Sequence, residues 1–413
     1  MENSLKLSKI INDPVHGFIE IPRGTILSLI DTAAFQRLRR IKQLGMSSLV
    51  YPGAQHTRFN HALGAMHLMR MALDVLKRKK VKIDKQEYRA ALIAILMHDI
   101  GHGPFSHALE HVIIPGMHHE EMSLALMHYL NKKLKGKLSL AIEIFEGKFE
   151  KHFLHQLVSS QLDMDRLDYL IRDSFFTGVV EGVIGTDRII KVLNVLDNQL
   201  VVEDKGIYSI EKFIVARRLM YWQVYLHKAA LSAEVTMVNI LKRARDLYQE
   251  GADLGLGDNL NFFFKHNITS SDLNKEVLER FIQLDDSDIE YAIKQWQHHK
   301  DPILADLCKR ILTRRLLKIH IQDEEVSQAD LEAKQAAFLE QSKLPKEALK
   351  YYVFTGTVAN QAYLENNREP ILIWFKKTGL QDLASASDIQ NIHTLSTPVV
   401  KYYLCYPHMK TKN

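Results

Sequence analysis

Apolar side chains recur every three or four residues along most of the first 250 positions, the spacing that puts them on one face of an α-helix. The pattern predicts a helix from Asp31, as its cap, to Gly45, a second from about Arg58 to Lys79, and a third from about Lys85 to Asp99. The third is apolar on almost every side from Ala90 to Met97. Because such a helix is buried all round, we expect it at the centre of the fold.

The same periodicity continues to about residue 250. It predicts shorter helices near 104–111 and 120–133, a helix over about 151–173, a β-hairpin at 189–203 and a long helix over about 210–249. Glycine and proline, which favour turns, are sparse at 19 and 10 of 413 positions. We therefore expect helix to dominate.

A glycine-rich stretch at residues 251–257 is the best candidate for a linker. We place a boundary there, between a core of residues 1–255 and a helical and small α+β region of residues 256–413. Three runs in this C-terminal region have the composition of strands: Tyr351–Thr355, Ile371–Phe375 and Val399–Cys405. The expected fold is mainly α, with a β-hairpin insertion and a small α+β lobe at the end.

Composition excludes several classes of protein. The chain is 46% hydrophobic and 25% charged, which is ordinary for a globular protein. Its two cysteines imply no disulfide framework, and its longest apolar run, Ala90 to Met97, is far too short to span a bilayer. We expect a soluble, cytoplasmic protein with no membrane partner. A net charge of only +5, without a basic, aromatic-rich stripe, argues against nucleic acid as the main partner.

Histidine is the residue type whose distribution points to chemistry. Nine of the 20 histidines fall between His56 and His119, far more than an even spread would place there. Imidazole binds metals and carries protons near neutral pH. His61 lies on the apolar face of its predicted helix and therefore points inward, and the pair His98–Asp99 ends the buried helix just before Gly101.

A metal site is one interpretation of these residues. Adjacent residues in mid-helix diverge by about 100°, so His98 and Asp99 can share one ion only near a helix end, where the following glycine puts them. A buried His–Asp pair is costly unless a charge compensates it. The alternative is a hydrogen-bonded core pair, which is the commoner role of a single inward histidine. Further along, Asp165, Tyr169 and Asp173 form a polar stripe at helical spacing.

Several motifs in a fixed order carry the resemblance to a known family. They are RFNH at 58–61, HDIGHGPFSH at 98–107 and DMDRLDY at 163–169, with further agreement at 11–17 and 35–45. Together they resemble the HD-domain phosphohydrolases, and more narrowly the deoxynucleoside triphosphate (dNTP) triphosphohydrolases related to the vertebrate SAM-and-HD-domain dNTPase. The resemblance is strong from about Lys9 to Lys228 and weak beyond about residue 255. It implies an HD-domain helical core, and the early start of the motifs implies no SAM module.

The resemblance implies a metal centre. In that family His61, His98, Asp99 and Asp165 would be the four protein ligands of one divalent ion. Such a set leaves coordination positions open for a water and a phosphate oxygen, and it suits Mn, Fe, Zn or Ni better than Mg. The family reaction is attack of water on the α-phosphorus of a dNTP, which releases a deoxynucleoside and triphosphate.

Acid–base chemistry is implied for His119, which would protonate the departing 5′ oxygen. Glu120 follows it as in the family. Glu110 stands where relatives carry Asp and would hold the tautomer of His119. The alternative for residues 118–120 is a polar helix start.

Substrate contacts are implied in the same way. The residues that would face the phosphates are Arg58, His102, His107 and Arg166, the last in place of a lysine. The residues that would face the deoxyribose and exclude a 2′ hydroxyl are Gln43, Leu44, Tyr169, Asp173 and Tyr225. The alternatives are surface, capping or packing roles.

In allosteric relatives a guanine nucleotide activates the enzyme at a site between subunits. The matching residues here are Lys9, Asp31, Gln36 and Arg39. The resemblance therefore implies a nucleotide activator and a homodimer or homotetramer. From the residues alone, Asp31 is equally well a helix cap and the basic residues a solvated face.

Two other functions stay open from the sequence. One is another HD-type enzyme, such as a nucleotide phosphatase or a cyclic-nucleotide phosphodiesterase, although the extended motifs around Gln43 and from Asp165 to Asp173 favour a triphosphate substrate. The other is a non-catalytic nucleotide sensor or nucleic-acid-binding protein, against which the intact ligand set argues.

Overall fold

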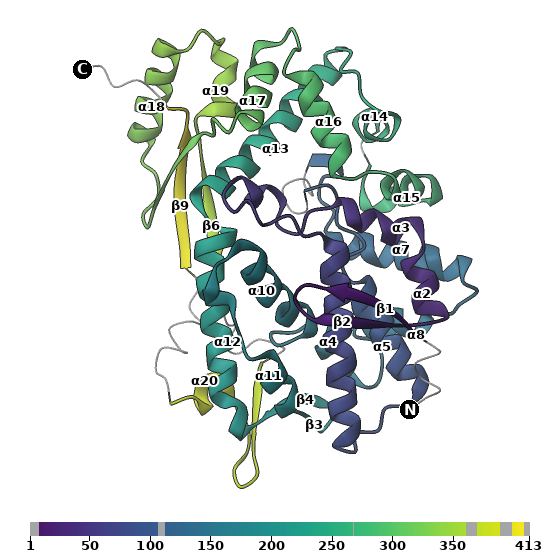
Figure 1. Cartoon of the computed structure of the whole chain (residues 1–413). Coiled ribbons are helices and arrows are strands. Elements are labelled where there is room, and N and C mark those ends of the chain that lie inside the picture. Colours follow the sequence, from purple (N-terminus) through teal and green to yellow (C-terminus); the bar gives the residue numbers. More distant parts are fainter. Residues whose placement is uncertain (1–7, 106–111, 267, 361–369, 389–398, 409–413) are drawn as a thin grey trace.

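The computed structural model describes residues 8–105, 112–266, 268–360, 370–388 and 399–408. Helices dominate this part of the chain (Figure 1), which confirms the expected class. The helices before residue 250 are α2 (Thr25–Ile30), α3 (Ala33–Gln36), α4 (Arg58–Arg78), α5 (Lys85–Met97), α7 (His119–Lys133), α8 (Ser139–Phe145), α9 (His152–Val158), α10 (Met164–Thr177), α11 (Thr186–Val192), α12 (Ile207–Met220) and α13 (Lys228–Gln249). Those after it are α14 (Asp258–Lys265), α15 (Lys275–Ile282), α16 (Asp286–Trp296), α17 (Pro302–Leu312), α18 (Gln328–Gln341), α19 (Leu349–Tyr352) and α20 (Leu383–Ala386).

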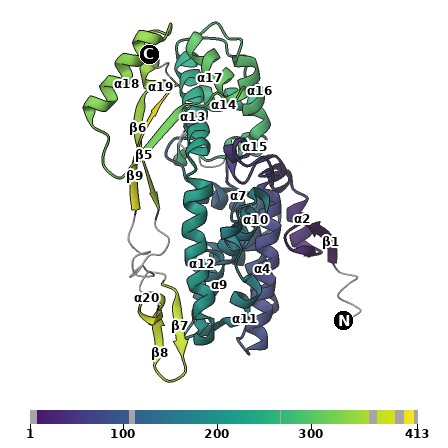
Figure 2. The ribbon, with the colours of Figure 1, turned by 60° about the vertical axis from the view of Figure 1, so that its left-hand side comes forward.

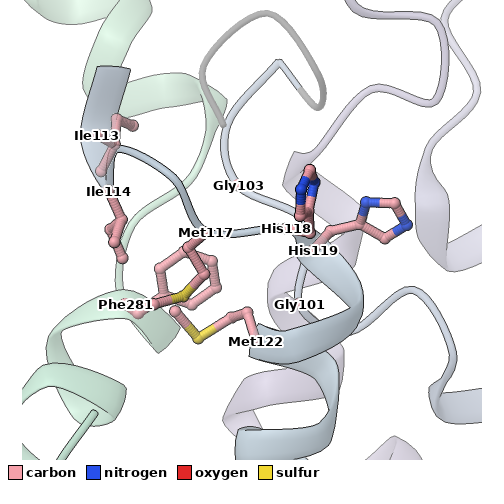
Figure 3. A pocket seen from close by; sticks show the side chains of 9 residues that line it. All are labelled: Gly101, Gly103, Ile113, Ile114, Met117, His118, His119, Met122 and Phe281. Carbon is pink, nitrogen blue, oxygen red and sulfur yellow. The ribbon is translucent and has the colours of Figure 1, made fainter. Parts of the chain in front are cut away.

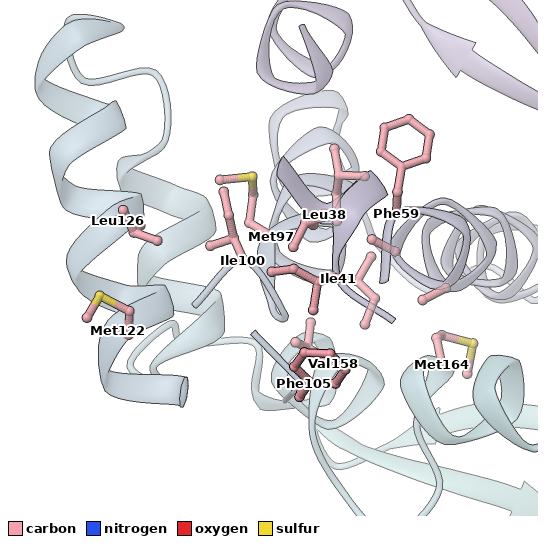
Figure 4. Packing of buried hydrophobic residues seen from close by; sticks show 14 of the residues in the cluster. Leu38, Ile41, Phe59, Met97, Ile100, Phe105, Met122, Leu126, Val158 and Met164 are labelled. Carbon is pink, nitrogen blue, oxygen red and sulfur yellow. The ribbon is translucent and has the colours of Figure 1, made fainter. Parts of the chain in front are cut away.

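The core is organised around α4 and α5. Helix α4 packs against both α5 and α10, and every residue from Ala90 to Met97 on α5 is buried, as the apolar pattern predicts. Asp84 caps α5 by accepting hydrogen bonds from the amides of Gln86 and Glu87, at 2.7 and 2.9 Å. Figure 4 shows apolar side chains of three segments meeting around the end of α5: Leu38, Ile41, Met97, Ile100, Met122 and Leu126.

The described strands form three small sheets around this core. An antiparallel hairpin joins β1 (Ser8–Asp13) to β2 (Gly17–Pro22). A four-stranded sheet has the order β3 (Leu193–Leu196), β4 (Gln199–Glu203), β7 (Leu372–Phe375) and β8 (Gly379–Asp382), with β4 and β7 parallel. A three-stranded sheet has the order β5 (Lys318–Gln322), β9 (Val399–Tyr406) and β6 (Phe354–Asn360), and β5 contacts α13 (Figure 2). The sheets confirm the hairpin insertion and the small α+β lobe.

The prediction of one helix from Asp31 to Gly45 is wrong. Asp31 already has helical backbone angles and ends α2, whereas Thr32 is extended and caps α3, accepting from the amide of Phe35 at 3.3 Å. A 3₁₀ turn follows at Arg37–Arg40, and the chain is then extended at Ile41. The regular apolar spacing is therefore satisfied by two short turns rather than one helix.

Two longer expected helices are each interrupted. The helix over 151–173 is two helices, α9 and α10, because the Asp163 carboxylate accepts from the amides of Ser160 and Arg166, each at 2.8 Å, and so caps α10. The helix over 210–249 is broken by a π-helical turn, Tyr221–Tyr225, after which His227 caps α13.

Smaller differences concern the strands. The hairpin begins at Leu193, since residues 186–192 form α11, and the chain is helical at Tyr351 and Tyr352 before β6 begins. Strands β1, β2, β5 and β8 were not predicted. Of the helix expected near 104–111, residues 106–111 lie outside the described residues, and Pro104 and Phe105 form a turn.

The described helices include none that combines the length and apolar character needed to cross a membrane.

Gly64 allows α4 and α10 to pack closely against each other. A Cβ added there would lie 2.0 Å from Oδ1 of Asp168 and 2.2 Å from a guanidinium nitrogen of Arg172. In an open helix Gly→Ala stabilises by about 1 kcal/mol. We expect Gly64→Ala instead to lower the free energy of unfolding by about 1 to 3 kcal/mol, because the helices must separate. Urea unfolding of both chains measures this change in the free energy of unfolding.

The matched control is Gly185→Ala, whose added Cβ would meet Arg188 at an ordinary 3.9 Å. It should change the unfolding midpoint little. A Gly64→Ala chain as stable as the original would contradict the close approach of the two helices.

Candidate metal centre and active-site cleft

Four side chains from three helical segments meet inside the core. His61 is on α4, His98 and Asp99 directly follow α5, and Asp165 is in the first turn of α10. The Nε2 atoms of His61 and His98 lie 3.3 Å apart, and Oδ1 of Asp165 lies 3.0 and 3.4 Å from them. The Asp99 oxygens lie 3.7 Å from His61 Nε2 and 3.3 Å from His98 Nε2. The structure thus brings together the four groups that the sequence analysis singled out.

This arrangement fits a divalent ion. Bonds of about 2.0–2.2 Å to one ion separate neighbouring ligand atoms by roughly 3.0–3.5 Å. The Nδ1 atoms are engaged elsewhere: that of His61 with Oδ2 of Asp168 at 2.8 Å, and that of His98 with the carbonyl of Ile95 at 2.6 Å. A carbonyl can only accept, so the Nδ1 of His98 carries the proton of this hydrogen bond. In the neutral ring Nε2 then has a lone pair, which faces the centre. Lone pairs and carboxylates that face one another at this range repel unless a cation lies between them.

The electrostatics of the centre also favour a positive charge. Burial by itself would lower the pKa of His61, yet its hydrogen bonds to Asp165 and Asp168 raise it to about 10. Burial would raise the pKa of Asp99, but the Arg58 guanidinium and nearby imidazoles hold it well below its usual range. The centre therefore stabilises cations, whether protons or a metal ion.

Asp168 bonds to the ring nitrogen of His61 that faces away from the metal centre. The sequence did not single out this residue for a role in the site. Its buried carboxylate bonds to His61 Nδ1, to Nε2 of His16 at 2.5 Å and to Nε of Arg172 at 2.8 Å. Arg172 in turn donates to Asp13 at 2.8 Å, so the β1–β2 turn is tied to the same network. A carboxylate behind a ligating imidazole fixes its tautomer and orientation. The feature of the sequence that could have indicated this role is the i, i+4 spacing of Asp168 and Arg172, next to the polar stripe of α10.

Cationic side chains lie beside the centre. Arg58 forms a buried ion pair with Asp99, and Nε2 of His102 lies 3.2 Å from Oδ1 of Asp99. The rings of His102 and His119 stack at 3.9 Å with 14° between their planes. Asp99, His102 and His119 could also be considered as a metal site. However, in nearly parallel rings the in-plane lone pairs do not converge, so these residues suit an anionic ligand better.

Gly101 explains how His119 reaches the cleft. A Cβ at Gly101 would lie 2.2 Å from the carbonyl oxygen of His119 and 2.3 Å from the amide of Ser123. Only a glycine lets the turn after α5 approach the start of α7 so closely. Ser123 then joins the two segments, because its hydroxyl donates to the carbonyl of His98 at 2.7 Å and accepts from the amide of Gly101 at 2.9 Å.

The polar stripe of α10 leads away from the metal centre. Asp173, two turns beyond Asp165, accepts from Tyr225 Oη at 2.8 Å, and its other oxygen lies 2.7 Å from His56 Nε2. The π-helical turn presents Tyr225 to this carboxylate, and Tyr169 meets the ring of Tyr225 edge-on at 6.1 Å.

A cleft of about 850 Å³ joins these groups, a volume within the usual range of small-molecule sites. Lining it are thirteen of the residues named in the sequence analysis: Gln43, Leu44, Arg58, His98, Asp99, His102, His119, Glu120, Asp165, Arg166, Tyr169, Asp173 and Tyr225. His61 is fully buried beneath it. Among the described residues, the buried atoms Oε1 of Gln43 and Nε of Arg166 have no hydrogen-bond partner. His107 and Glu110 lie outside the described residues.

The residues expected at an activator site lie away from the cleft. Lys9 is exposed on β1, and Asp31 is exposed at the end of α2. Gln36 donates to the carbonyl of Ile30 at 2.8 Å and accepts from Arg39 at 2.8 Å. Three of the four are thus adjacent around α2 and α3.

Comparison with known proteins agrees with this geometry. The HD domain matches residues 58–173, and the HD associated region matches residues 184–251. A phosphohydrolase crystal structure from Bacteroides thetaiotaomicron is 48% identical with a TM-score of 0.93, covering 97% of this chain and 100% of that chain. An uncharacterized protein of Bacillus subtilis, YwfO, is 34% identical over 93% of this chain and 89% of its own length.

These matches and the His–Asp centre define an HD-domain protein. The chain belongs to the HD-domain phosphohydrolases. A deoxynucleoside triphosphate triphosphohydrolase, the SAMHD1 homolog of Dictyostelium discoideum, is 35% identical over 59% of this chain. This chain spans about half the length of that relative, 50%. It spans 45% of the length of human SAMHD1, to which it is 30% identical.

The metal centre gives a direct prediction. Asp165→Ala removes the carboxylate oxygen nearest to both imidazoles, so we expect metal affinity to fall by more than the roughly 10- to 100-fold that loss of a supporting hydrogen bond typically costs. Elemental analysis of chain dialysed against limiting Mn²⁺ measures the bound ion. Tyr169→Phe, one turn further along α10, is the matched control and should retain it. Equal metal content in the Asp165→Ala chain would refute this ligand role.

Proposed function

We propose that the protein is a metal-dependent dNTP triphosphohydrolase, in which water attacks the α-phosphorus to give a deoxynucleoside and triphosphate. The observation that carries this proposal is the single cleft that joins the His–Asp centre, a set of cationic side chains and the Asp173–Tyr225 pair. A phosphate ester that reaches the centre would place its sugar at that pair. The SAMHD1 relatives, named as dNTP triphosphohydrolases, support the same substrate class.

A divalent ion held by His61, His98, Asp99 and Asp165 would lower the pKa of a bound water and polarise a phosphoryl oxygen. The mixed donor set favours Mn, Fe, Zn or Ni over Mg. The remaining steps fall to side chains of the chain itself.

Arg58, His102 and Arg166 bind the triphosphate, and the pairing of Arg58 with Asp99 holds its guanidinium beside the attacked phosphorus. His119, whose ring is aligned by stacking on His102, gives a proton to the 5′ oxygen as the bond from phosphorus to that oxygen breaks. The new phosphorus–oxygen bond comes from water, so the triphosphate leaves intact. Glu120 follows His119 at the cleft wall, and His107 and Glu110 remain assigned by resemblance alone.

Deoxyribose is selected at the other end of the cleft. Asp173 already bonds to His56 and Tyr225, and its free lone pairs accept the 3′ hydroxyl. Gln43, Leu44 and Tyr169 close around the sugar ring. Crowding alone discriminates by only about 1 to 3 kcal/mol, so a 2′ hydroxyl is rejected mainly where it would leave polar groups unpaired.

The activator site and the oligomer are part of the same proposal. Lys9, Asp31, Gln36 and Arg39 would receive a guanine nucleotide between two subunits of a homodimer or homotetramer. The grouping of Gln36 and Arg39 on adjacent turns supports a shared surface there.

Product analysis tests the function. The Mn²⁺-loaded chain is incubated with each dNTP alone and in pairs, since pairs reveal activation by a second nucleotide. We expect dGTP to yield deoxyguanosine and triphosphate in equal amounts, separated by chromatography. Release of dGMP or of single phosphates would indicate another HD-type phosphatase or phosphodiesterase. Tight, salt-sensitive binding of single-stranded DNA without turnover of any nucleotide would indicate the non-catalytic alternative, a nucleotide sensor or nucleic-acid-binding protein.

A matched pair of variants belongs to this test. His119→Gln should lower kcat by roughly 10²- to 10⁴-fold, the usual contribution of a general acid, without changing metal content. His128→Gln, on the exposed face of the same helix, should leave kcat unchanged.

A further inference from the structure

The segment at the end of α15 and the start of α16 packs against loops that border the cleft, although it lies far along the chain. It runs from Phe281 to Asp286 and is outside both matched regions, residues 58–173 and 184–251. The sequence gives these residues no role. In the structure the segment packs against two loops of the core, one preceding Gln43 and one following His102.

Asp286 joins the two loops with one carboxylate. Its Oδ2 accepts from the amide of Lys42 at 2.9 Å, and its Oδ1 accepts from the amide of Phe105 at 2.7 Å. The side chain is 4% exposed. Lys42 directly precedes Gln43 and Leu44, whereas Phe105 lies three residues after His102. The carboxylate therefore joins two neighbouring loops of the cleft wall and fixes their relative position.

Arg37 makes a second connection among the same three segments. Its guanidinium donates to the carbonyls of Leu284 at 2.7 Å, Ile100 at 3.2 Å and His102 at 2.5 Å, and it lies 4.4 Å above the ring of Phe281. Figure 3 shows Phe281 beside Met117 in a small cavity that Gly101 and Gly103 also line. The segment thus packs against the turn that follows His98 and Asp99.

Asp286 is not explained by stability alone. Burial raises the pKa of its carboxyl to about 6, although the two amides that donate to it lower it in part. Burial of this carboxylate in its charged form costs free energy, and what the carboxylate provides is the pair of backbone hydrogen bonds that joins the two loops. Phe105 also has a φ of +51°, an unusual angle for a residue with a side chain, and its amide is held by this carboxylate.

We propose that Asp286 is a positioning residue that clamps the loops at Lys42 and Phe105, so that the C-terminal region holds Gln43 and Leu44 in place and with them the discrimination against ribose. The clamp itself is a property of the fold. The consequence for sugar selection rests on the proposed dNTP triphosphohydrolase activity.

Asp286→Asn tests the clamp. An amide offers one acceptor oxygen, and its NH₂ group then faces the other backbone amide, donor against donor. We expect amide hydrogen exchange at Lys42 or Phe105 to accelerate at least tenfold. We expect kcat/KM for dGTP to fall 10- to 100-fold, and the dGTP-to-GTP ratio of kcat/KM to fall at least fivefold, with metal content unchanged. Asp286→Glu, which keeps both acceptors, should recover part of each effect.

The matched control is Glu290→Gln on the same helix. It removes the exposed ion pair of Glu290 with the Lys42 ammonium, 2.8 Å long, and leaves the backbone contacts of Asp286 in place. It should change neither the exchange nor the dGTP-to-GTP ratio. An Asp286→Asn chain with unchanged exchange at both amides overturns the clamp, and so does equal loss of activity in the Glu290→Gln chain.

Amide exchange needs no substrate, so it tests the clamp even if the chain hydrolyses no dNTP. In that case accelerated exchange supports the clamp while the proposed function fails. Accelerated exchange with an unchanged dGTP-to-GTP ratio would overturn the role in sugar selection. If Asp286→Asn does not fold, the same measurements on Asp286→Glu decide: an intermediate acceleration supports the clamp, and none overturns it.

Discussion

Two imidazole nitrogens and two carboxylates face one another across 3.0 to 3.7 Å in the interior of this protein, and the packing of α4, α5 and α10 serves to hold them there. Such groups cannot be buried together without positive charge among them. Three helical segments must also deliver them to one point from different directions. Helix α4 supplies one group from its side, α5 supplies two from its end, and α10 supplies one from its first turn.

Close helix packing makes this convergence possible. Gly64 lets α10 approach α4, so that Asp168 and Arg172 reach the back of His61, and Gly101 lets α7 approach the turn after α5. The first of these contacts carries the network outward, from His61 through Asp168 and Arg172 to Asp13 on the N-terminal hairpin. The centre is therefore held by elements from both sides, and its imidazoles have little freedom to turn.

The sequence predicts the core well because its signals are local. The apolar run before His98, the inward face that carries His61 and the spacing of Asp165, Tyr169 and Asp173 each depend on residues within a few turns of one another. The breaks in the helices were less predictable. Asp163 could continue a helix or cap the next one, and the hydrogen bonds that decide between these appear only in the fold. The π-helical turn has no sequence signature that periodicity can detect.

Local patterns do not predict contacts over long separations, and the meeting of His61 with Asp165 was expected only from the family resemblance. Asp286 meets the amide of Lys42 across 244 positions, and no local pattern marks either residue. The β1–β2 hairpin was also missed, because each strand has six residues and only β2 buries alternate side chains, Ile19 and Ile21.

The parallel pairing of β4 with β7 has a consequence for biosynthesis. Strand β4 ends at Glu203, but its partner begins only at Leu372. At about 5 to 20 residues per second, a ribosome needs on the order of 10 to 30 seconds to produce the intervening chain. During that interval one edge of the nascent hairpin has open amides and carbonyls, the arrangement that recruits foreign strands. Slow translation or premature termination in this interval should therefore favour aggregation of the nascent chain, even though the residues of the metal centre have already been made.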